Sequence, residues 1–253
     1  MRDPRSVIEA IESAPELPGG KEECFTGYVV MGLPFHSGHV LGLRKWAASS
    51  IGPAYTAVWH RSPDNVWATY SDVTSRLGCA RYIGTQLRAA REARIVVTWP
   101  EQFRLHVSIP EIALEWDIEV APTPATRLMN TVAHVIPRAA WRNHSFLSTL
   151  SRIAGPMLGL GRVSFTGTMP NGQYFIANPR TIWMIERSSA TLAGEDFGTP
   201  APLGQQSRLG GFWIPQRGVL AVGDICFEAF DGARHSDQLT ALNGERVTTQ
   251  EKP

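Results

Sequence analysis

The sequence predicts an α+β protein dominated by antiparallel β-strands, built as a β-barrel or a strongly curved sheet with a helical insertion. About ten short runs of β-branched and aromatic residues are separated by Gly, Pro and Asn turns. Several runs alternate strictly between apolar and polar residues, as a strand with one buried face does. The chain does not alternate regularly between strands and helices, which argues against a parallel sheet. Closing or curling an antiparallel sheet protects its edge strands.

Composition limits the class of protein. The chain has 253 residues, 43% hydrophobic and 19% charged, so it can bury a full core and is not intrinsically disordered. A formal net charge of +1 excludes the basic footprint of a dedicated nucleic-acid binder. No apolar run reaches the roughly 18 residues of a membrane helix, and the first residues lack the apolar stretch of a signal peptide. The three cysteines are widely spaced, which favours reduced thiols and a cytoplasmic protein.

Helices are expected at three places. The first begins at Pro4, because Asp3 can cap it and proline suits the first helical position. Apolar residues at helical spacing predict a second helix over 79–93. The third place is a helical insertion, which Pro137 interrupts. The expected units are an N-terminal helix and linker (1–24), one β-domain (25–230) with the helical insertion at about 124–158, and a polar tail (231–253).

Turn residues divide the rest of the chain into strands. Ser62-Pro63-Asp64-Asn65 separates two aromatic runs and predicts a hairpin, and Asn171-Gly172 supplies the positive φ angles of another. The predicted strands cover, in chain order, residues 25–33, 39–47, 54–60, 66–71, 94–99, 103–109, 112–119, 163–169, 173–177, 181–186, 211–214 and 219–230.

The hairpin over 103–119 carries the candidate catalytic residues. A two-residue turn at Pro110-Glu111 would pair His106 with Glu115 and Arg104 with Asp117 on its polar face. If this face lines a barrel lumen, the histidine and carboxylate form an acid/base unit that the second pair orients. The alternative is that this face is the solvated outside, with ordinary cross-strand ion pairs.

Aromatic residues with polar tips are the candidate ligand-binding residues. They suit an apolar pocket that orients a ligand, and they suit an ordinary barrel core equally well. Arg217 lies in a Gly- and Pro-rich segment that reads either as a gating loop with an anion clamp or as a strand break. Asp224 is an acid candidate if its strand face turns inward. The full set is Trp46, Tyr55, Trp59, His60, Trp67, Tyr70, Trp116, Arg217 and Asp224.

Other catalytic patterns receive less support. His36, His39 and His60 could form an open zinc site, but an H-E-x-x-H motif and a neighbouring acidic ligand are missing, so no metal is expected. The sequence also lacks the phosphate-binding, dinucleotide-binding and G-x-S-x-G motifs. ATPases, Rossmann dehydrogenases and ordinary α/β-hydrolases are therefore not expected.

Two hairpins carry a resemblance to a known family. The segment Trp59-His60-Arg61-Ser62-Pro63-Asp64-Asn65-Val66-Trp67 and the segment Thr168-Met169-Pro170-Asn171-Gly172-Gln173, followed by Trp183, resemble the lipocalin-like barrels of the carotenoid 1,2-hydratase and AttH-type group. The resemblance covers 25–230 and implies a lipocalin-like β-barrel with a ligand pocket. Members of that group have two barrels in a longer chain, so no catalytic residue is carried over.

These observations lead to one expected function and two alternatives. We expect binding of a hydrophobic, terpenoid- or polyketide-like small molecule and its acid/base conversion by hydration, cyclisation or isomerisation, as in a cofactor-free lyase or isomerase. The alternatives are a non-catalytic carrier with the same pocket and a metal-dependent enzyme. Nucleic acid and a membrane span are not expected, and a homodimer is left open.

Overall fold

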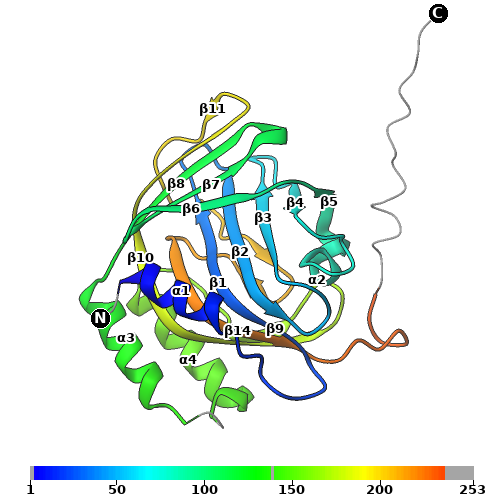
Figure 1. Ribbon diagram of the computed structural model, residues 1–253. Coiled ribbons are helices and arrows are strands. Elements are labelled where there is room, and N and C mark those ends of the chain that lie inside the picture. Colours follow the sequence, from blue (N-terminus) through cyan, green and yellow to red (C-terminus); the bar gives the residue numbers. More distant parts are fainter. Residues whose placement is uncertain (1–2, 138–139, 237–253) are drawn as a thin grey trace, which may run out of the picture.

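The central feature is a strongly curled, mostly antiparallel sheet. A computed structural model describes residues 3–137 and 140–236 (Figure 1). The main path of the sheet runs β5-β4-β3-β2-β1-β14-β10-β8-β7-β6, with β9 and β11 paired to β10, and a separate pair is formed by β12 and β13. The strands are β1 (Glu23–Pro34), β2 (Val40–Ser49), β3 (Tyr55–Arg61), β4 (Trp67–Ser71), β5 (Leu87–Glu92), β6 (Val96–Glu101), β7 (Arg104–Ile109), β8 (Leu114–Ala121), β9 (Thr166–Thr168), β10 (Tyr174–Leu192), β11 (Glu195–Asp196), β12 (Arg208–Leu209), β13 (Phe212–Trp213) and β14 (Val219–Phe227).

The predicted fold class is confirmed. Of the two expected forms, a β-barrel and a strongly curved sheet, the protein has the strongly curved sheet. Within the described residues no pairing joins β5 to β6, the two ends of the path. The curl brings β6, β7 and β8 across the front of β1, β2 and β3 (Figure 1). The sheet is therefore a half-barrel with apolar side chains on both faces of its central strands.

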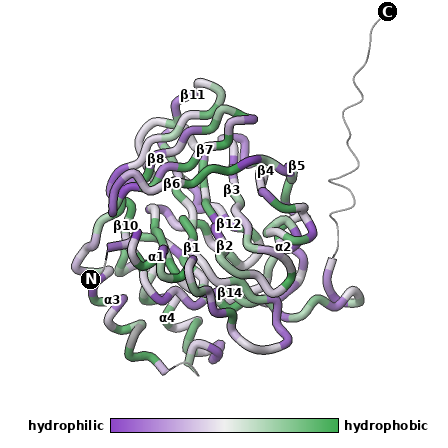
Figure 2. The backbone as a smooth tube through the Cα atoms, in the orientation of Figure 1, coloured by the Kyte–Doolittle hydropathy of each residue, from purple (hydrophilic) through white to green (hydrophobic). Residues whose placement is uncertain are grey.

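In the described part of the chain four α-helices accompany the sheet: α1 (Pro4–Ser13), α2 (Ala80–Ile83), α3 (Pro124–Val135) and α4 (His144–Met157). The α1 helix begins as predicted, because the Asp3 carboxylate accepts a hydrogen bond from the Ser6 amide at 2.8 Å. The tube of α3 and α4 alternates between hydrophobic and hydrophilic residues, as in helices with one apolar face (Figure 2). None of the helices in the described part of the chain is long and apolar enough to cross a bilayer.

Two apolar clusters lie on opposite faces of the central strands. Alternation along β2 sends Leu41 and Leu43 to one face and Trp46 to the other. We name each cluster after the part of the molecule beside it. The hairpin-side cluster, between the central strands and β7–β8, includes Ile8, Val30, Leu43, Val107, Trp116 and Trp183. The chamber-side cluster, on the other face, includes Phe25, Trp46, Trp59, Phe165, Phe175 and Phe212.

A disulfide joins two neighbouring strands. Cys24 of β1 and Cys226 of β14 are directly opposed in the ladder and are bonded, while Cys79 is a free, buried thiol. The expectation of three reduced cysteines is wrong for this pair, because only the folded sheet brings together residues separated by 202 positions. Since disulfides persist mainly in oxidising compartments, the cysteines no longer support a cytoplasmic location.

The 103–119 hairpin has a different register from the predicted one. His106 pairs with Asp117 and Arg104 pairs with Glu119, so the predicted register is wrong by two residues. The cause is the turn, which is a 3₁₀ turn over Pro110–Ile112 followed by Ala113 in the left-handed region at φ 49°. A shift of two preserves the faces of both strands, because side chains alternate with a period of two.

Other expectations failed where tertiary pairing overrides local pattern. The predicted helix over 79–93 is helical only at α2 and in a short 3₁₀ turn, and its remainder is β5, which pairs in parallel with β4. The separate strands predicted at 173–177 and 181–186 form the single strand β10, which pairs with β14 on both sides of a bulge at Pro179. Of the predicted tail, residues 237–253 lie outside the described residues.

Candidate functional site

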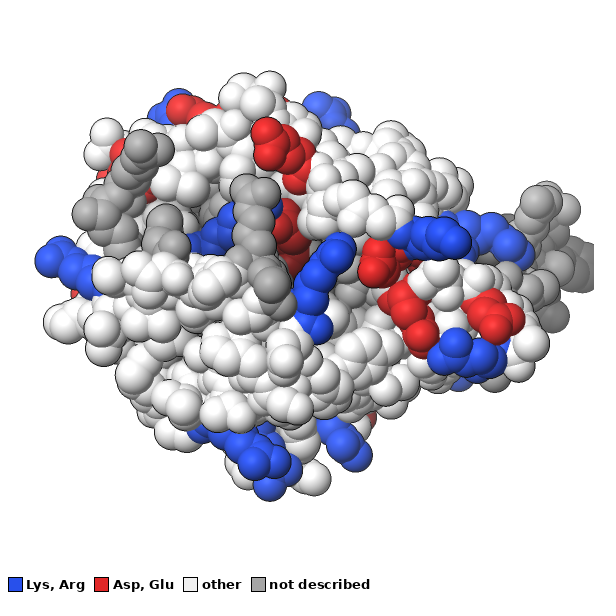
Figure 3. All heavy atoms as spheres, turned by 90° about the horizontal axis from the view of Figure 1, so that it is seen from below, with Lys and Arg blue, Asp and Glu red and all other residues white. Residues whose placement is uncertain are grey.

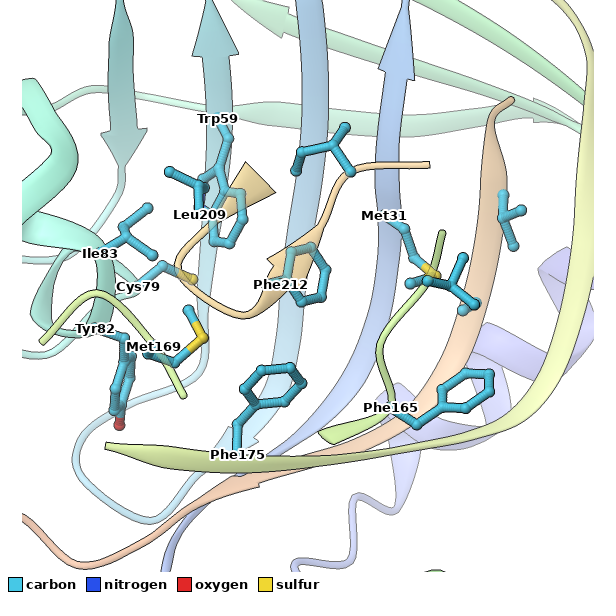
Figure 4. Packing of buried hydrophobic residues seen from close by; sticks show 14 of the residues in the cluster. Met31, Trp59, Cys79, Tyr82, Ile83, Phe165, Met169, Phe175, Leu209 and Phe212 are labelled. Atoms are coloured by element: carbon cyan, nitrogen blue, oxygen red, sulfur yellow. The ribbon is translucent and has the colours of Figure 1, made fainter. Parts of the chain in front are cut away.

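A two-part chamber lies on the chamber-side face of the sheet. The outer hollow has a cavity volume of about 60 Å³ and opens toward solvent, and the inner hollow has one of about 30 Å³. One water molecule needs about 10–15 Å³ of such volume, so each hollow has room for a group of a few atoms. Four residues line both hollows: Arg44, Trp46, Phe212 and Ile225. Figure 4 shows Phe212 between Met31 and Phe165 on one side and Trp59 and Cys79 on the other.

Elements distant in sequence supply the walls. The outer hollow is bordered by β1, β2, β10 and β14, with Phe165 and Phe212 packed over them. The inner hollow lies between β2, β3, α2 and β13, and its remaining wall residues are Phe25, Tyr55, Trp59, Cys79, Tyr82, Met169 and Phe227. Tyr82 and Phe227 stack with ring centroids 3.7 Å apart, which closes one side. Seen from below, the surface is hollowed near its centre and charged side chains lie at depth there (Figure 3).

Arg44 is the charged residue of the inner hollow, and it is only 4% exposed. Its Nη1 donates hydrogen bonds to the carbonyl oxygens of Val30 at 2.7 Å and Leu43 at 2.9 Å. Its Nη2 donates to the carbonyl oxygen of Met31 at 3.1 Å, and the guanidinium lies 3.8 Å from the Trp59 ring centroid. Burial lowers the pKa of Arg44 to about 10, so it is cationic at neutral pH. Within the described residues no carboxylate forms an ion pair with it.

Further hydrogen-bond donors surround this cation. The indole Nε1 atoms of Trp46 and Trp59 are buried and have no hydrogen-bond partner. Both indoles lie near the Cys79 thiol without making a hydrogen bond to it. The Tyr55 hydroxyl is 3.2 Å from Cys79 Sγ. Burial raises the pKa of both Tyr55 and Cys79, so both groups stay protonated at neutral pH.

Comparisons with known proteins leave the chain unassigned. No protein-family model matches it, and none of the curated proteins matches its sequence. Among solved structures, it is similar to the acetoacetate decarboxylase of Legionella pneumophila, with 11% sequence identity, a TM-score of 0.39, and coverage of 88% of this chain and 93% of that chain. This likeness is too distant to carry a residue assignment, and the resemblance to the carotenoid 1,2-hydratase group stays a prediction.

Three predicted ligand-binding residues meet in the inner hollow. Trp46, Tyr55 and Trp59 all line it, because positions 55, 57 and 59 of β3 face the same side of the sheet as Trp46. Trp67 is buried in the chamber-side cluster but does not line either hollow.

The other predicted ligand residues lie elsewhere. Tyr70 and Trp116 belong to the hairpin-side cluster, on the opposite face of the central strands. Asp224 lines the outer hollow, and its carboxylate accepts hydrogen bonds from Thr26 at 2.7 Å and Arg180 at 2.6 Å. Arg217 is exposed and lines neither hollow.

The four candidate catalytic residues do come together. His106 Nε2 lies 3.0 Å from Glu115 Oε2, and His106 Nδ1 lies 3.4 Å from Asp117 Oδ1. Arg104 Nη2 lies 3.2 Å from the same Asp117 oxygen. All four side chains are partly or largely exposed on the polar face of β7 and β8, and the opposite face of those strands covers the hairpin-side cluster. The central strands and this cluster therefore separate the set from the chamber.

The histidines considered for a metal split into a pair and a single residue. His39 Nδ1 lies 2.8 Å from His60 Nε2, and the two rings stack with Phe197. His39 Nε2 lies 3.3 Å from Glu195 Oε1, whereas His36 is exposed. No group of three or more His, Cys, Asp or Glu side chains is placed to hold a metal within the described residues.

Acidification is expected to destabilise the fold through His60. Burial and, secondly, the His39 ring lower the pKa of His60 to about 4, while the unfolded chain keeps a value of about 6.5. The unfolded state therefore binds a proton first as the pH falls. His60 leaves stability unchanged above pH 6.5 and lowers the free energy of unfolding by on the order of 3 kcal/mol as the pH approaches 4.

Urea denaturation at pH 4.5–7.5 checks this expectation. The variant H60Q should show a flatter dependence of the unfolding free energy on pH than the wild type. The exposed His36 provides the control, because H36Q should keep the wild-type slope. Equal slopes for the wild type and H60Q would contradict the prediction.

The sequence analysis missed most of the lining residues, among them Arg44 and Cys79. The sequence does contain a signal for Arg44. It lies on the same face of its strand as Trp46, and the other face carries Leu41 and Leu43. A charge on a strand with two apolar faces must be buried, and buried charges cluster at functional sites. Cys79 gave no such signal, because its place in the inner hollow depends on how α2 docks against the sheet.

Proposed function

We propose that this protein binds a hydrophobic small molecule in the chamber formed by the outer and inner hollows. The observation that supports this most is the lining: two adjoining hollows with walls that are mainly aromatic and aliphatic side chains. Such walls fit the terpenoid- or polyketide-like skeleton that the sequence favours. The few polar groups at their junction, Arg44 and the two indoles, would orient the ligand.

A binding function fits the chamber better than acid/base conversion within it. The titratable groups in the inner hollow are cationic or protonated at neutral pH, since burial raises the pKa of Tyr55 and Cys79 and Arg44 keeps its charge. They donate hydrogen bonds but do not supply a general base, and the carboxylate of the outer hollow, Asp224, is held by Thr26 and Arg180. Carriage of the ligand is therefore our first proposal.

Acid/base conversion is the second candidate, and the His106 set supports it. His106 contacts the carboxylates of Glu115 and Asp117, and such an arrangement can hold a proton between the imidazole and a carboxylate. For this function the ligand would have to reach the outer face of β7 and β8. We expect H106A and E115Q to leave chamber binding unchanged. Loss of ligand turnover in both variants, with the fold intact, would favour the enzyme over the carrier.

Filling the chamber tests the binding function. Ala177 lines the outer hollow, so A177F should reduce the affinity for a neutral apolar probe at least about tenfold by occupying its space. The probe is N-phenyl-1-naphthylamine, followed by its fluorescence and displaced by geraniol. Ala68, half-buried on the hairpin side, receives the same exchange as a control, and A68F should bind as the wild type does. Equal affinities in A177F and A68F would refute the proposal, with circular dichroism confirming that both variants are folded.

A further inference from the structure

We propose that the inner hollow is a carboxylate receptor, in which the side-on edge of the Arg44 guanidinium binds the two oxygens. An arginine has five N–H donors. Three strand carbonyls take both donors of Nη1 and one donor of Nη2. The two donors left are Nε–H and one Nη2–H, and they form one edge of the guanidinium when Met31 accepts from the Nη2–H on the Nη1 side. This edge is one to which carboxylates bind with two parallel hydrogen bonds.

The surroundings of that edge also favour an anion. Trp46 and Trp59 are 6% and 5% exposed, and the indole N–H of each is buried without a partner. An indole nitrogen can only donate a hydrogen bond. Leaving a buried donor unsatisfied is unfavourable, so each indole gains from an acceptor that enters the hollow. The inner hollow therefore has several donors in its lining and no carboxylate of its own within the described residues.

Charge balance selects the kind of anion. Arg44 is the single cationic residue among the described residues that line the two hollows, and the carboxylate of Asp224 in the outer hollow is already paired with Arg180. A buried cation without a partner is unfavourable, and one monoanion neutralises it. A phosphate dianion would leave an excess negative charge in an apolar cage. The planar two-oxygen carboxylate matches both the charge and the geometry of the free edge.

The position of Arg44 then defines the ligand class. Arg44 and Trp46 line both hollows, so a head group bound at the guanidinium can extend its apolar part along the outer hollow toward solvent. The ligand would be a hydrophobic carboxylic acid in its ionised form. This inference rests on the proposed hydrophobic-ligand function, since it assigns the head group of the same ligand.

Matched pairs of ligands test the head group. Octanoate and octanamide have the same chain and nearly the same shape, as do 3-phenylpropanoate and 3-phenylpropanamide, and only the acids carry charge. Isothermal titration calorimetry at pH 7.5 should show the acid of at least one pair binding at least about 30-fold more tightly than its amide, as expected for a buried charge pair. Equal binding of acid and amide would overturn the carboxylate site while leaving the hydrophobic chamber standing. If none of the four ligands binds, the result counts against the carboxylate site. If N-phenyl-1-naphthylamine also fails to bind, the chamber itself is refuted.

Variants locate the receptor. R44M keeps the length of the side chain and removes the charge, so the preference for the acid should disappear. R187M removes an exposed arginine that lines neither hollow and should keep the preference. W46F removes one indole donor, keeps the aromatic wall and should weaken acid binding about tenfold with little effect on the amide. A preference for the acid that survives in both R44M and W46F would place the anion elsewhere and overturn the proposal. W46F keeps the test decisive if R44M does not fold.

Discussion

Reduction of the Cys24–Cys226 disulfide is expected to lower the free energy of unfolding by about 2–5 kcal/mol. The bond joins residues 202 positions apart, so it closes nearly the whole chain into a loop in the unfolded state. A chain-entropy account places the effect of so long a loop near the upper end of this range. The bond also joins β1 to β14 in the middle of the sheet. These two strands pair although they lie near opposite ends of the chain.

Urea denaturation with and without a thiol reductant measures this effect. The unfolding midpoint of the wild type should fall on reduction. The double variant C24A/C226A should start near the reduced value and should not respond to the reductant, which controls for Cys79. A wild-type midpoint that is insensitive to complete reduction, verified by thiol titration, would contradict the prediction.

Replacement of Trp116 by alanine is expected to lower the free energy of unfolding by about 3–5 kcal/mol. Trp116 is completely buried in the hairpin-side cluster, and its indole donates a hydrogen bond to the Ser188 hydroxyl at 2.9 Å. The loss comes mainly from the cavity, because the Ser188 hydroxyl keeps its own bond to the Asp117 carbonyl oxygen. Domains are stable by only about 5–15 kcal/mol, so W116A removes a large fraction of the total.

The same variant separates stability from ligand binding. Trp116 was predicted from the sequence as a ligand-binding residue, but it lies on the face opposite the chamber. We expect folded W116A to bind N-phenyl-1-naphthylamine as the wild type does, although it unfolds at lower urea concentration. The half-buried Trp213 offers a comparison, because W213A should lose less stability. Equal losses in W116A and W213A would contradict the burial argument.

These expectations follow from the difference between the two apolar faces of the central strands. Changes on the hairpin side, such as W116A, should act on stability alone. Changes in the chamber, such as R44M and A177F, should act on binding, because there the walls surround empty space instead of packing against a second layer of strands. The polar face of β7 and β8 is a third region, whose contribution to function the H106A and E115Q variants measure.

Much of the fold was predictable from local pattern. Period-two alternation placed Leu105, Val107 and Trp116 together on a buried face and His106 on a polar one, although the register itself was wrong. That assignment survived because parity depends on each strand alone, whereas register depends on the turn between them. The same parity brought Tyr55 and Trp59 to one wall.

The fold class, most of the strands and the side of the sheet that each side chain takes follow from the spacing of apolar residues along the backbone. Which strands meet and which face encloses space depend on contacts that form only in the folded protein. The Cys24–Cys226 bond, the strand β5 within a helical pattern and the chamber around Arg44 all arise from contacts between distant segments. Such contacts depend on how the sheet curls, and the local spacing of apolar residues does not specify that curl.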